Sequence, residues 1–266
     1  MLDAARGQAI RLGDPEWTGG PDPYADRVDS FRAGRRTDQN VVDFLAARTG
    51  PDASVMEIGA GAGRLSLPLA QRVRELIALE PSPTMADTLE ADAQAAGVGN
   101  LRVMRGRWED LEGVTTDAVF AAHLVYGLPS IEDFLLRLHA TARNWCAVIL
   151  FGEPSQSRLS DFWPAVFGES RMPNPHLPQL LDVLWSMGIF PDVSMLEVPA
   201  WPLGPAARAR NGLRRRLRVV PGTAADARLA SAMAELLVDW GDGQLGPRDR
   251  RQLQLGTVHW AARRSD

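Results

Sequence analysis

Short, almost wholly apolar runs recur along this chain and alternate with longer segments that carry an apolar stripe at helical spacing. An order of strand, helix, strand predicts a mostly parallel sheet with helices on both faces. Strands that are covered on both faces must be apolar throughout, and the runs in this chain meet that requirement. We therefore expect an α/β fold in which right-handed crossovers connect the strands.

The same pattern gives the expected bounds of the elements. The expected strands cover residues 54–58, 76–80, 101–105, 118–122, 146–151, 193–198 and 257–262, which together would make a seven-stranded sheet. The expected helices cover residues 39–47, 64–73, 83–96, 131–143, 180–187, 205–217 and 224–240. Residues 1–30 are rich in Gly, Pro and Asp, so we expect an irregular arm or short helices there.

We expect residues 1–266 to form a single domain, since no internal repeat and no clear linker interrupts the chain. Its expected parts, in chain order, are an N-terminal arm (1–38), a cofactor-binding core (39–153), a segment that completes the core (154–202), a helical insertion (203–250) and the last strand (251–266). The arm and the insertion are the parts that we expect to cover a bound ligand.

Charge and composition limit the possible partners. The formal net charge is −4, whereas a protein that neutralises many phosphates is usually basic, so a nucleic-acid partner is disfavoured. No apolar stretch approaches the roughly 18 residues of a membrane span, and the N-terminus lacks the apolar core of a secretion signal. The lone Cys146 cannot form an internal disulfide. We expect a cytoplasmic protein without a membrane partner, and the sequence leaves its oligomeric state open.

A glycine-rich turn joins the strand at 54–58 to the helix that follows. It reads Glu57-Ile58-Gly59-Ala60-Gly61-Ala62-Gly63-Arg64. Glycines let the backbone turn sharply and approach a ligand closely, and the next helix offers free N–H groups at its start. Two cofactor classes fit such a turn, a dinucleotide and S-adenosylmethionine. The dinucleotide fingerprint Gly-x-Gly-x-x-Gly would need a third glycine where this chain has Arg64, and the acidic Glu57 would repel a pyrophosphate.

The spacing Glu-x-Gly-x-Gly-x-Gly resembles motif I of the class I S-adenosylmethionine-dependent methyltransferases, and the likeness extends over about residues 35–153. The resemblance implies a Rossmann-like fold and S-adenosylmethionine as the cofactor. It also implies that Glu57 receives the amino group of the cofactor and that Gly59, Ala60, Gly61 and Gly63 cradle its amino-acid part.

The resemblance also implies cofactor contacts at the ends of the second and third strands. Glu80 ends the second strand, where an acid can accept hydrogen bonds from both ribose hydroxyls. Pro81 and Met85 follow, and the family often packs an apolar residue on the adenine; an ordinary core methionine is an equally good interpretation of Met85. After the third strand Arg107 stands where many relatives have an adenine-binding acid, so we assign this contact to Trp108 or Glu109.

The turn after the fourth strand reads Ala121-Ala122-His123-Leu124-Val125-Tyr126. Ligands bind off the carboxyl ends of parallel strands, so we expect Ala121 and His123 near the sulfonium of the cofactor. A histidine there could take a proton from a nucleophile, which makes His123 a candidate catalytic base. Tyr126 is a candidate substrate contact in the same turn. The alternative is that His123 caps a helix or contacts only backbone or cofactor.

Other conspicuous residues have simpler interpretations. A run of arginines between Arg208 and Arg218 could attract an anionic substrate, although a solvated helix face is the more common explanation. The tryptophans of the second half could line an apolar pocket or simply pack in the core. His139, His176 and His259 have no acidic or Cys partner at ligand spacing, so no metal is expected.

The sequence therefore predicts a methyltransferase that acts on a small molecule, by O-, N- or C-methylation. By the resemblance, members that methylate bases or amides usually carry an [N/D]PP[Y/F] motif after the fourth strand, from which this chain departs. Catechol-type members need acidic magnesium ligands near that strand, and none are evident. Two alternatives stay open: a protein that binds S-adenosylmethionine without methyl transfer, cyclase-like or regulatory, and an NAD(P)-dependent oxidoreductase.

Overall fold

The computed structural model describes residues 1–266 except 13–21, 23, 25–27, 35–37, 155–156 and 263–266. The chain divides into two compact units, each assembled from separate stretches. The sheet unit comprises Gly20–Gly152, Leu177–Val198 and Gln254–Asp266, and the helical unit comprises Met1–Gly19, Glu153–His176 and Pro199–Leu253. The expected core-completing segment 154–202 is thus shared between the two units, and the interpretation as one domain stays a prediction.

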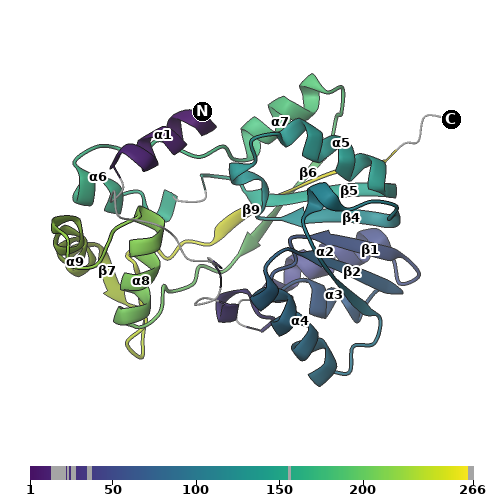
Figure 1. Cartoon of the computed structure of the whole chain (residues 1–266), viewed down its shortest axis with the longest axis horizontal. Coiled ribbons are helices and arrows are strands. Elements are labelled where there is room, and N and C mark those ends of the chain that lie inside the picture. Colours follow the sequence, from purple (N-terminus) through teal and green to yellow (C-terminus); the bar gives the residue numbers. More distant parts are fainter. Residues whose placement is uncertain (13–21, 23, 25–27, 35–37, 155–156, 263–266) are drawn as a thin grey trace. The chain divides into compact units, whose positions relative to one another are not determined.

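A seven-stranded sheet forms the centre of the sheet unit (Figure 1). Its strands are β1 (Ser54–Ile58), β2 (Glu75–Glu80), β3 (Leu101–Arg105), β4 (Thr116–Ala122), β5 (Ala142–Phe151), β6 (Asp192–Val198) and β9 (Leu253–Ala261), in the spatial order β3-β2-β1-β4-β5-β9-β6. The five strands from β3 to β5 pair in parallel, and β9 runs antiparallel to β5. The expected α/β fold with a mostly parallel sheet is confirmed.

Helices cover both faces of this sheet. They are α2 (Gln39–Thr49), α3 (Ser66–Ala70), α4 (Pro83–Ala95), α5 (Ile131–Thr141) and α7 (Leu177–Ser186), with 3-10 turns η1 (Val28–Phe31), η2 (Trp108–Asp110) and η3 (Val125–Gly127). Apolar residues of α5 and α7 pack in one core with Met56 and Ile58 of β1. The alternate β1 residue Glu57 meets Ser66 of α3, so α3 covers the opposite face.

The order of the strands creates a switch point. From β1 the chain moves outward to β2 and β3 and then returns to the other side of β1 to form β4. At such a point the connections leave the sheet in opposite directions, which opens a crevice beyond the carboxyl ends of β1 and β4. The glycine-rich turn and the turn after β4 both lie there.

Two helices of this unit end two or more residues before their expected ends. The helix expected at 64–73 is shorter in the structure, where α3 covers Ser66–Ala70. The Ser66 hydroxyl donates a hydrogen bond to Glu57 at the start of α3, and β2 already begins at Glu75. The helix expected at 131–143 ends at Thr141, and β5 begins immediately. Arg143 there binds Asp117 at 2.9 Å and Ser54 at 2.9 Å, which holds the start of β5 beside β4.

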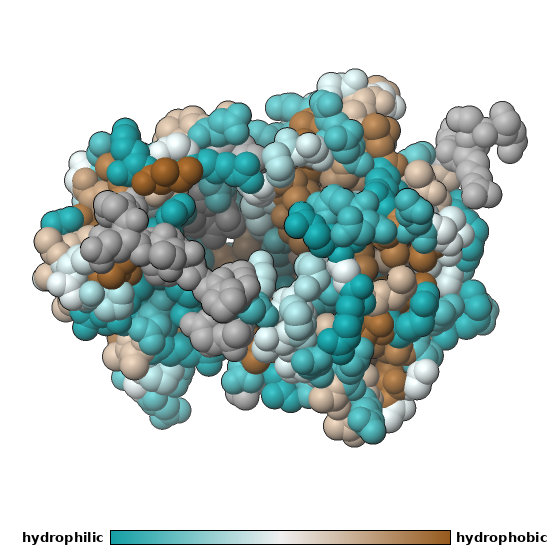
Figure 2. Space-filling view, in the orientation of Figure 1, coloured by the Kyte–Doolittle hydropathy of each residue, from teal (hydrophilic) through white to brown (hydrophobic). Residues whose placement is uncertain are grey.

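The helical unit has its own apolar core. Its elements are α1 (Leu2–Leu12), η4 (Ser157–Leu159), α6 (Phe162–Phe167), α8 (Ala206–Leu217), α9 (Ala224–Leu236), β7 (Leu237–Asp239) and β8 (Leu245–Pro247). Phe162 and Trp163 of α6 pack with Leu213 of α8 and Leu229 of α9. In Figure 2 the surface over α8 is mostly hydrophilic, which fits a solvated face for the arginine run.

The helix expected at 224–240 is wrong in its last turn. Leu237–Asp239 instead forms β7, which pairs antiparallel with β8. The turn between them contains Gly241, Asp242 and Gly243, all with positive φ, and the Trp240 indole N–H donates to the Pro247 carbonyl at 2.9 Å. Two glycines in three residues favour a hairpin turn over a helix.

Candidate functional site

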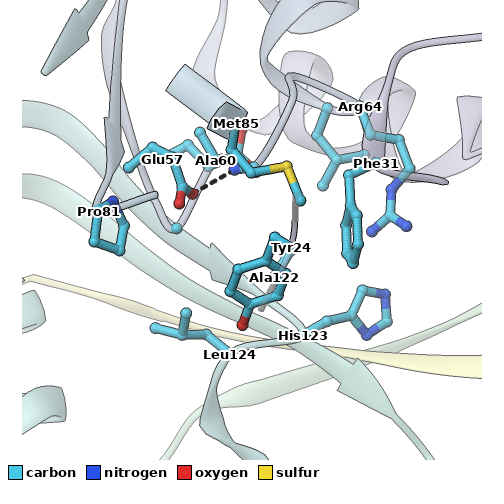
Figure 3. A pocket seen from close by; sticks show the side chains of 14 residues that line it. Tyr24, Phe31, Glu57, Ala60, Arg64, Pro81, Met85, Ala122, His123 and Leu124 are labelled. Atoms are coloured by element: carbon cyan, nitrogen blue, oxygen red, sulfur yellow. Dashed lines mark hydrogen bonds between the residues drawn. The ribbon is translucent and has the colours of Figure 1, made fainter. Parts of the chain in front are cut away.

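A pocket lies in the sheet unit at the carboxyl ends of β1, β2 and β4 (Figure 3). The residues that line it are Tyr24, Phe31, Glu57, Gly59, Ala60, Gly61, Arg64, Leu65, Glu80, Pro81, Met85, Ala122, His123 and Leu124. Eight of them are among the residues that the sequence singled out: Glu57, Gly59, Ala60, Gly61, Glu80, Pro81, Met85 and His123. The switch point of the sheet therefore brings most of the expected residues to one cavity.

The backbone of the glycine-rich turn is held by the second strand. The N–H groups of Gly59 and Ala60 donate to the Leu79 carbonyl at 2.9 and 3.1 Å. The N–H of Gly61 donates to the Glu80 carboxylate at 2.7 Å, the bond drawn in Figure 3. A pyrophosphate would need these same backbone N–H groups as hydrogen-bond donors, and they are already bonded to Leu79 and Glu80. The turn is therefore poorly suited to a dinucleotide.

Gly63 has a different task from the other glycines. A Cβ atom at Gly63 would lie 2.3 Å from Leu89 Cδ1 and 3.3 Å from Leu67 Cγ. Its φ is +85° as well, a conformation that side chains other than glycine rarely adopt. Gly63 does not line the pocket and is required instead where the turn packs against α3 and α4.

Glu57 is a buried acid on the wall of the pocket. Its side chain accepts a hydrogen bond from the Ser66 hydroxyl, and only 2% of the residue is exposed. Burial raises the pKa of Glu57 to about 8; the bond from Ser66 and the charge of Arg64 act in the opposite direction, and the Glu80 carboxylate adds to the rise. A cation placed beside Glu57 would relieve this cost, so the position is suited to an ammonium group.

Glu80 is the second buried acid of the pocket. Its carboxylate accepts the N–H groups of Gly61 at 2.7 Å and Ser82 at 2.8 Å. Burial raises its pKa, and these two hydrogen bonds oppose the rise. Each carboxylate oxygen has two lone pairs, so both can also accept a hydroxyl hydrogen bond from a ligand.

Pro81 and Met85 lie beside Glu80. Ser82 caps α4 by accepting the Met85 N–H at 3.3 Å, which fixes the start of the helix at the pocket. Met85 is 2% exposed, so it is part of the core and also lines the cavity. The two interpretations of this methionine are therefore both compatible with its position.

His123 lies on the turn after β4 in a left-handed backbone conformation, with φ of +58°. Its ring lies 4.7 Å, centroid to centroid, from the Phe151 ring, and its Nδ1 lies 2.9 Å from the Tyr126 hydroxyl. Tyr126 itself does not line the pocket and accepts the Phe151 N–H at 2.8 Å. The structure thus brings His123 to the pocket and places Tyr126 behind it.

The other expected contacts lie away from the cavity. Ala121 is fully buried, and its neighbour Ala122 lines the pocket in its place. Trp108 packs on Phe134 at 6.0 Å, and its indole N–H has no hydrogen-bond partner among the described residues. Glu109 is an exposed side chain whose carboxylate lies 3.4 Å from Arg107 Nε. The adenine assignment to Trp108 or Glu109 stays a prediction.

Several lining residues were not singled out from the sequence. Arg64 is one of the side chains that line the pocket (Figure 3). Its Nε lies 2.8 Å from Asp38 Oδ2. Tyr24 and Phe31 belong to the N-terminal arm, which the sequence suggested only as a cover. Arg32 ties this arm to the site, since it bridges to the Gly63 backbone and its Nε donates to Asp92 of α4 at 2.8 Å.

The described residues also bear on two other kinds of partner, a membrane and a metal ion. In that part of the chain no helix has the length and apolarity needed to cross a membrane. The same residues include no group of three or more His, Cys, Asp or Glu side chains arranged to hold a metal ion.

Comparison with known proteins agrees with this geometry. Residues 55–144 match the family model described as "Methyltransferase domain". The chain is 34% identical over 94 residues to a protein of Methanosarcina barkeri named "Probable ribosomal RNA small subunit methyltransferase A", an alignment that covers 35% of this chain and 32% of that protein. The chain thus spans only about a third to two fifths of the length of the curated relatives it matches.

Solved structures show the same fold at low sequence identity. The YcgJ protein of Bacillus subtilis aligns with a TM-score of 0.59 and 13% identity over 85% of this chain and 100% of its own. Magnesium protoporphyrin IX methyltransferase from Synechocystis, solved with bound SAH, aligns with a TM-score of 0.53 and 14% identity over 97% and 93% of the two chains. Residues 55–144 therefore match a methyltransferase domain, and the chain shares the α/β fold of these solved structures.

Proposed function

We propose that this protein is an S-adenosylmethionine-dependent methyltransferase that acts on a small molecule. The observation that carries the proposal is the pair of buried acids, Glu57 and Glu80, on one pocket at the switch point of the sheet. The matched methyltransferase domain includes both residues.

The residues present fit the cofactor. Glu57, whose pKa is raised by burial, would hold the ammonium group, because a cation relieves the cost of a buried carboxylate. Glu80 would accept the ribose hydroxyls, and Pro81 with Met85 would border the adenine. Arg64 has the sign needed for the carboxylate of the same amino-acid moiety.

Methyl transfer asks little of the protein beyond alignment. The bound cofactor supplies a methyl group that its sulfonium already activates for in-line displacement. The residues of this chain hold that group, exclude water and position the acceptor. His123 lines the pocket and takes the proton that a hydroxyl or amine acceptor loses when it becomes methylated.

A second candidate substrate class is ribosomal RNA, since the relatives matched in sequence carry that name. The net charge of −4 and the turn Ala121-Ala122-His123, which lacks the [N/D]PP[Y/F] motif, favour the small molecule.

Methyl-labelled S-adenosylmethionine tests the activity directly. The protein is incubated with a bacterial metabolite extract, with ribosomal RNA, and without an acceptor. We expect label in a low-molecular-mass product only with the extract. Label in the RNA would replace the small-molecule proposal with the second candidate. Calorimetric binding of the cofactor with no label transferred in any arm would favour a binding protein, and binding of NAD instead would favour an oxidoreductase.

A further inference from the structure

We infer that Tyr126 is a positioning residue for this reaction: its hydroxyl group holds the His123 imidazole in the orientation in which His123 accepts the proton of the methyl acceptor. The inference rests on the proposed function and adds a residue that lies outside the pocket. It also corrects the direct substrate contact that the sequence suggested for Tyr126, because Tyr126 does not line the pocket.

The backbone conformation of His123 determines the direction in which its side chain leaves the chain. His123 is one of three residues other than glycine with positive φ in the described part of the chain, and its N–H donates to the Ile149 carbonyl at 2.8 Å. A histidine in the left-handed region is strained, and such strain persists only where the surroundings impose it. Here the bond to β5 imposes it and turns the His123 side chain toward the cavity.

Aromatic rings then restrict how the imidazole can rotate. The Phe151 ring lies 4.7 Å from the His123 ring at 38°, and the Tyr126 ring is nearly parallel to both, at 20° to His123 and 21° to Phe151. Rings at these distances attract one another and leave few rotamers open. The stack therefore removes most of the rotational freedom of His123 before any ligand binds.

The Tyr126 hydroxyl supplies the remaining constraint. It accepts the Phe151 N–H at 2.8 Å and lies 2.9 Å from His123 Nδ1. A hydroxyl group can accept two hydrogen bonds and donate one. It can therefore accept the Phe151 N–H and the Nδ1–H of His123 at the same time, which favours the tautomer that leaves Nε2 free to accept a proton.

An acceptor at Nδ1 matches what a base that works through Nε2 needs. Before the reaction the imidazole is neutral, and afterwards both of its nitrogens carry protons. An imidazole that accepts a proton at Nε2 already carries its own proton on Nδ1, so the Tyr126 hydroxyl accepts the Nδ1–H both before and after the transfer, and the ring does not have to move. An acceptor for the Nδ1–H also stabilises the charged imidazolium, which makes His123 a stronger base.

The variant Tyr126→Phe isolates the hydroxyl group, because it keeps the aromatic stack. Histidine side chains labelled with 15N are followed by NMR from pH 5 to 9, and the four histidines are assigned by single His→Gln variants. We expect the pKa of His123 to fall by about one to two units in Tyr126→Phe, the size of one hydrogen bond to a charged group. The signals of His139, His176 and His259 serve as internal controls and stay unchanged.

Neighbouring charges are the same in the two proteins whose His123 pKa values are compared. The charged groups that line the pocket with His123 are Arg64, Glu57 and Glu80, and all three are present in both proteins. An unchanged pKa and unchanged 15N shifts of His123 would overturn the inference. Should Tyr126→Phe fail to fold, 3-fluorotyrosine in place of both tyrosines weakens the hydroxyl as an acceptor, and the pKa of His123 should still fall.

Two further measurements separate this inference from the proposed function. Calorimetry with S-adenosylhomocysteine should give the same affinity for Tyr126→Phe as for the unchanged protein. With an acceptor identified, kcat should fall about tenfold, a part of the 10²- to 10⁴-fold that a positioned base contributes. Absence of cofactor binding in both proteins would remove the proposed function and leave the NMR result to decide on Tyr126. Binding with unchanged NMR signals would remove only the inference.

Discussion

Glu57 and Gly63 stand in the same turn but meet different physical demands. Glu57 is an acid kept out of water, with Ser66 as its hydrogen-bond donor, and this arrangement makes sense for a ligand that brings a positive charge. Gly63 faces away from the ligand and is glycine because Leu89 leaves no room for a side chain. The sequence pattern alone assigns both residues to the cofactor, and only the packing separates them.

Replacement of Glu57 by glutamine should weaken cofactor binding. The amide keeps the shape and the partner Ser66 but cannot supply the negative charge. A hydrogen bond to a charged group contributes roughly 1.5–3 kcal/mol, so we expect the Kd for S-adenosylhomocysteine to rise about ten- to a hundredfold. Titration calorimetry measures the change, and the exposed acid Glu132 of α5 gives the control Glu132→Gln, which should bind as before. Equal affinities for both variants would remove Glu57 from the site.

The raised pKa of Glu57 makes cofactor binding depend on pH. Below a pKa of about 8 the carboxyl group is protonated in the free protein and must lose its proton to hold an ammonium group. Affinity should therefore increase with pH up to about 8 and then level off. Calorimetry at pH 7 in buffers of different ionisation enthalpy should show proton release on binding, and the release should disappear in Glu57→Gln.

The same shift acts on the folding of the free protein. A carboxyl group with a raised pKa in the folded state stabilises that state fully below its unfolded value of 4.5, and loses this contribution as pH rises to about 8. The difference in unfolding free energy between Glu57→Gln and the unchanged protein should thus grow in favour of the variant over that range, as urea denaturation would show. A constant difference would mean that the pKa is not raised.

Two alanine variants test the different tasks of the glycines. Gly63→Ala should cost about 2–4 kcal/mol, because it combines a left-handed backbone with a clash against Leu89. Gly61→Ala has the same backbone strain, but its Cβ would lie at an ordinary 3.6 Å from Phe31, so it should cost about 1–2 kcal/mol. Thermal or chemical unfolding ranks the two, and the reverse order would contradict the packing role of Gly63.

At the scale of elements, the sequence identified the alternating strands and helices because their burial leaves a strong pattern. It failed where a few contacts overrule that pattern. Arg143 reads as the end of a helix, yet its bonds to Asp117 and Ser54 place it in β5. The stretch Leu237–Asp239 continues a helical apolar stripe, yet the Gly241 and Gly243 turn makes it a strand. The candidate site followed from motif spacing, whereas Tyr24 and Phe31 come from a segment with no regular pattern.

The joint between α8 and α9 depends on a buried ion cluster. Asp226 accepts hydrogen bonds from Arg214 at 2.7 and 2.8 Å and from Arg210 at 2.9 Å, and its side chain is 5% exposed. The bonds from Arg214 hold the pKa of Asp226 well below its ordinary value of 3.8. The cluster therefore stabilises the fold above about pH 4 and loses this effect as pH falls further. Two of the arginines that suggested an anion site are thereby paired within the unit.

Asp226→Asn should lower the free energy of unfolding by about 3 kcal/mol at pH 7, because two arginines lose their carboxylate. The exposed Glu235 on the same helix provides the control Glu235→Gln, which should change stability by no more than about 0.5 kcal/mol. Urea unfolding at pH 7 and pH 3 tests both. A deficit of Asp226→Asn that does not shrink at pH 3 would show that the charge is not the cause.

For the whole molecule, the fold limits where a ligand can bind, but the substrate has to be identified by experiment. The order of strands places a crevice at β1 and β4, and the glycine-rich turn fills that position with the acids and small residues that a positively charged amino-acid ligand needs. One fold can host many unrelated reactions, so function has to be argued from the site rather than from the architecture. The central claim is therefore the proposal that Glu57 and Glu80 bind S-adenosylmethionine.

A crystal structure of the protein with S-adenosylhomocysteine tests that claim most directly. We predict the amino group of the ligand within hydrogen-bond distance of the Glu57 carboxylate and both ribose hydroxyls on Glu80. A ligand bound elsewhere, or one seated in this pocket with neither acid in contact, would contradict the account.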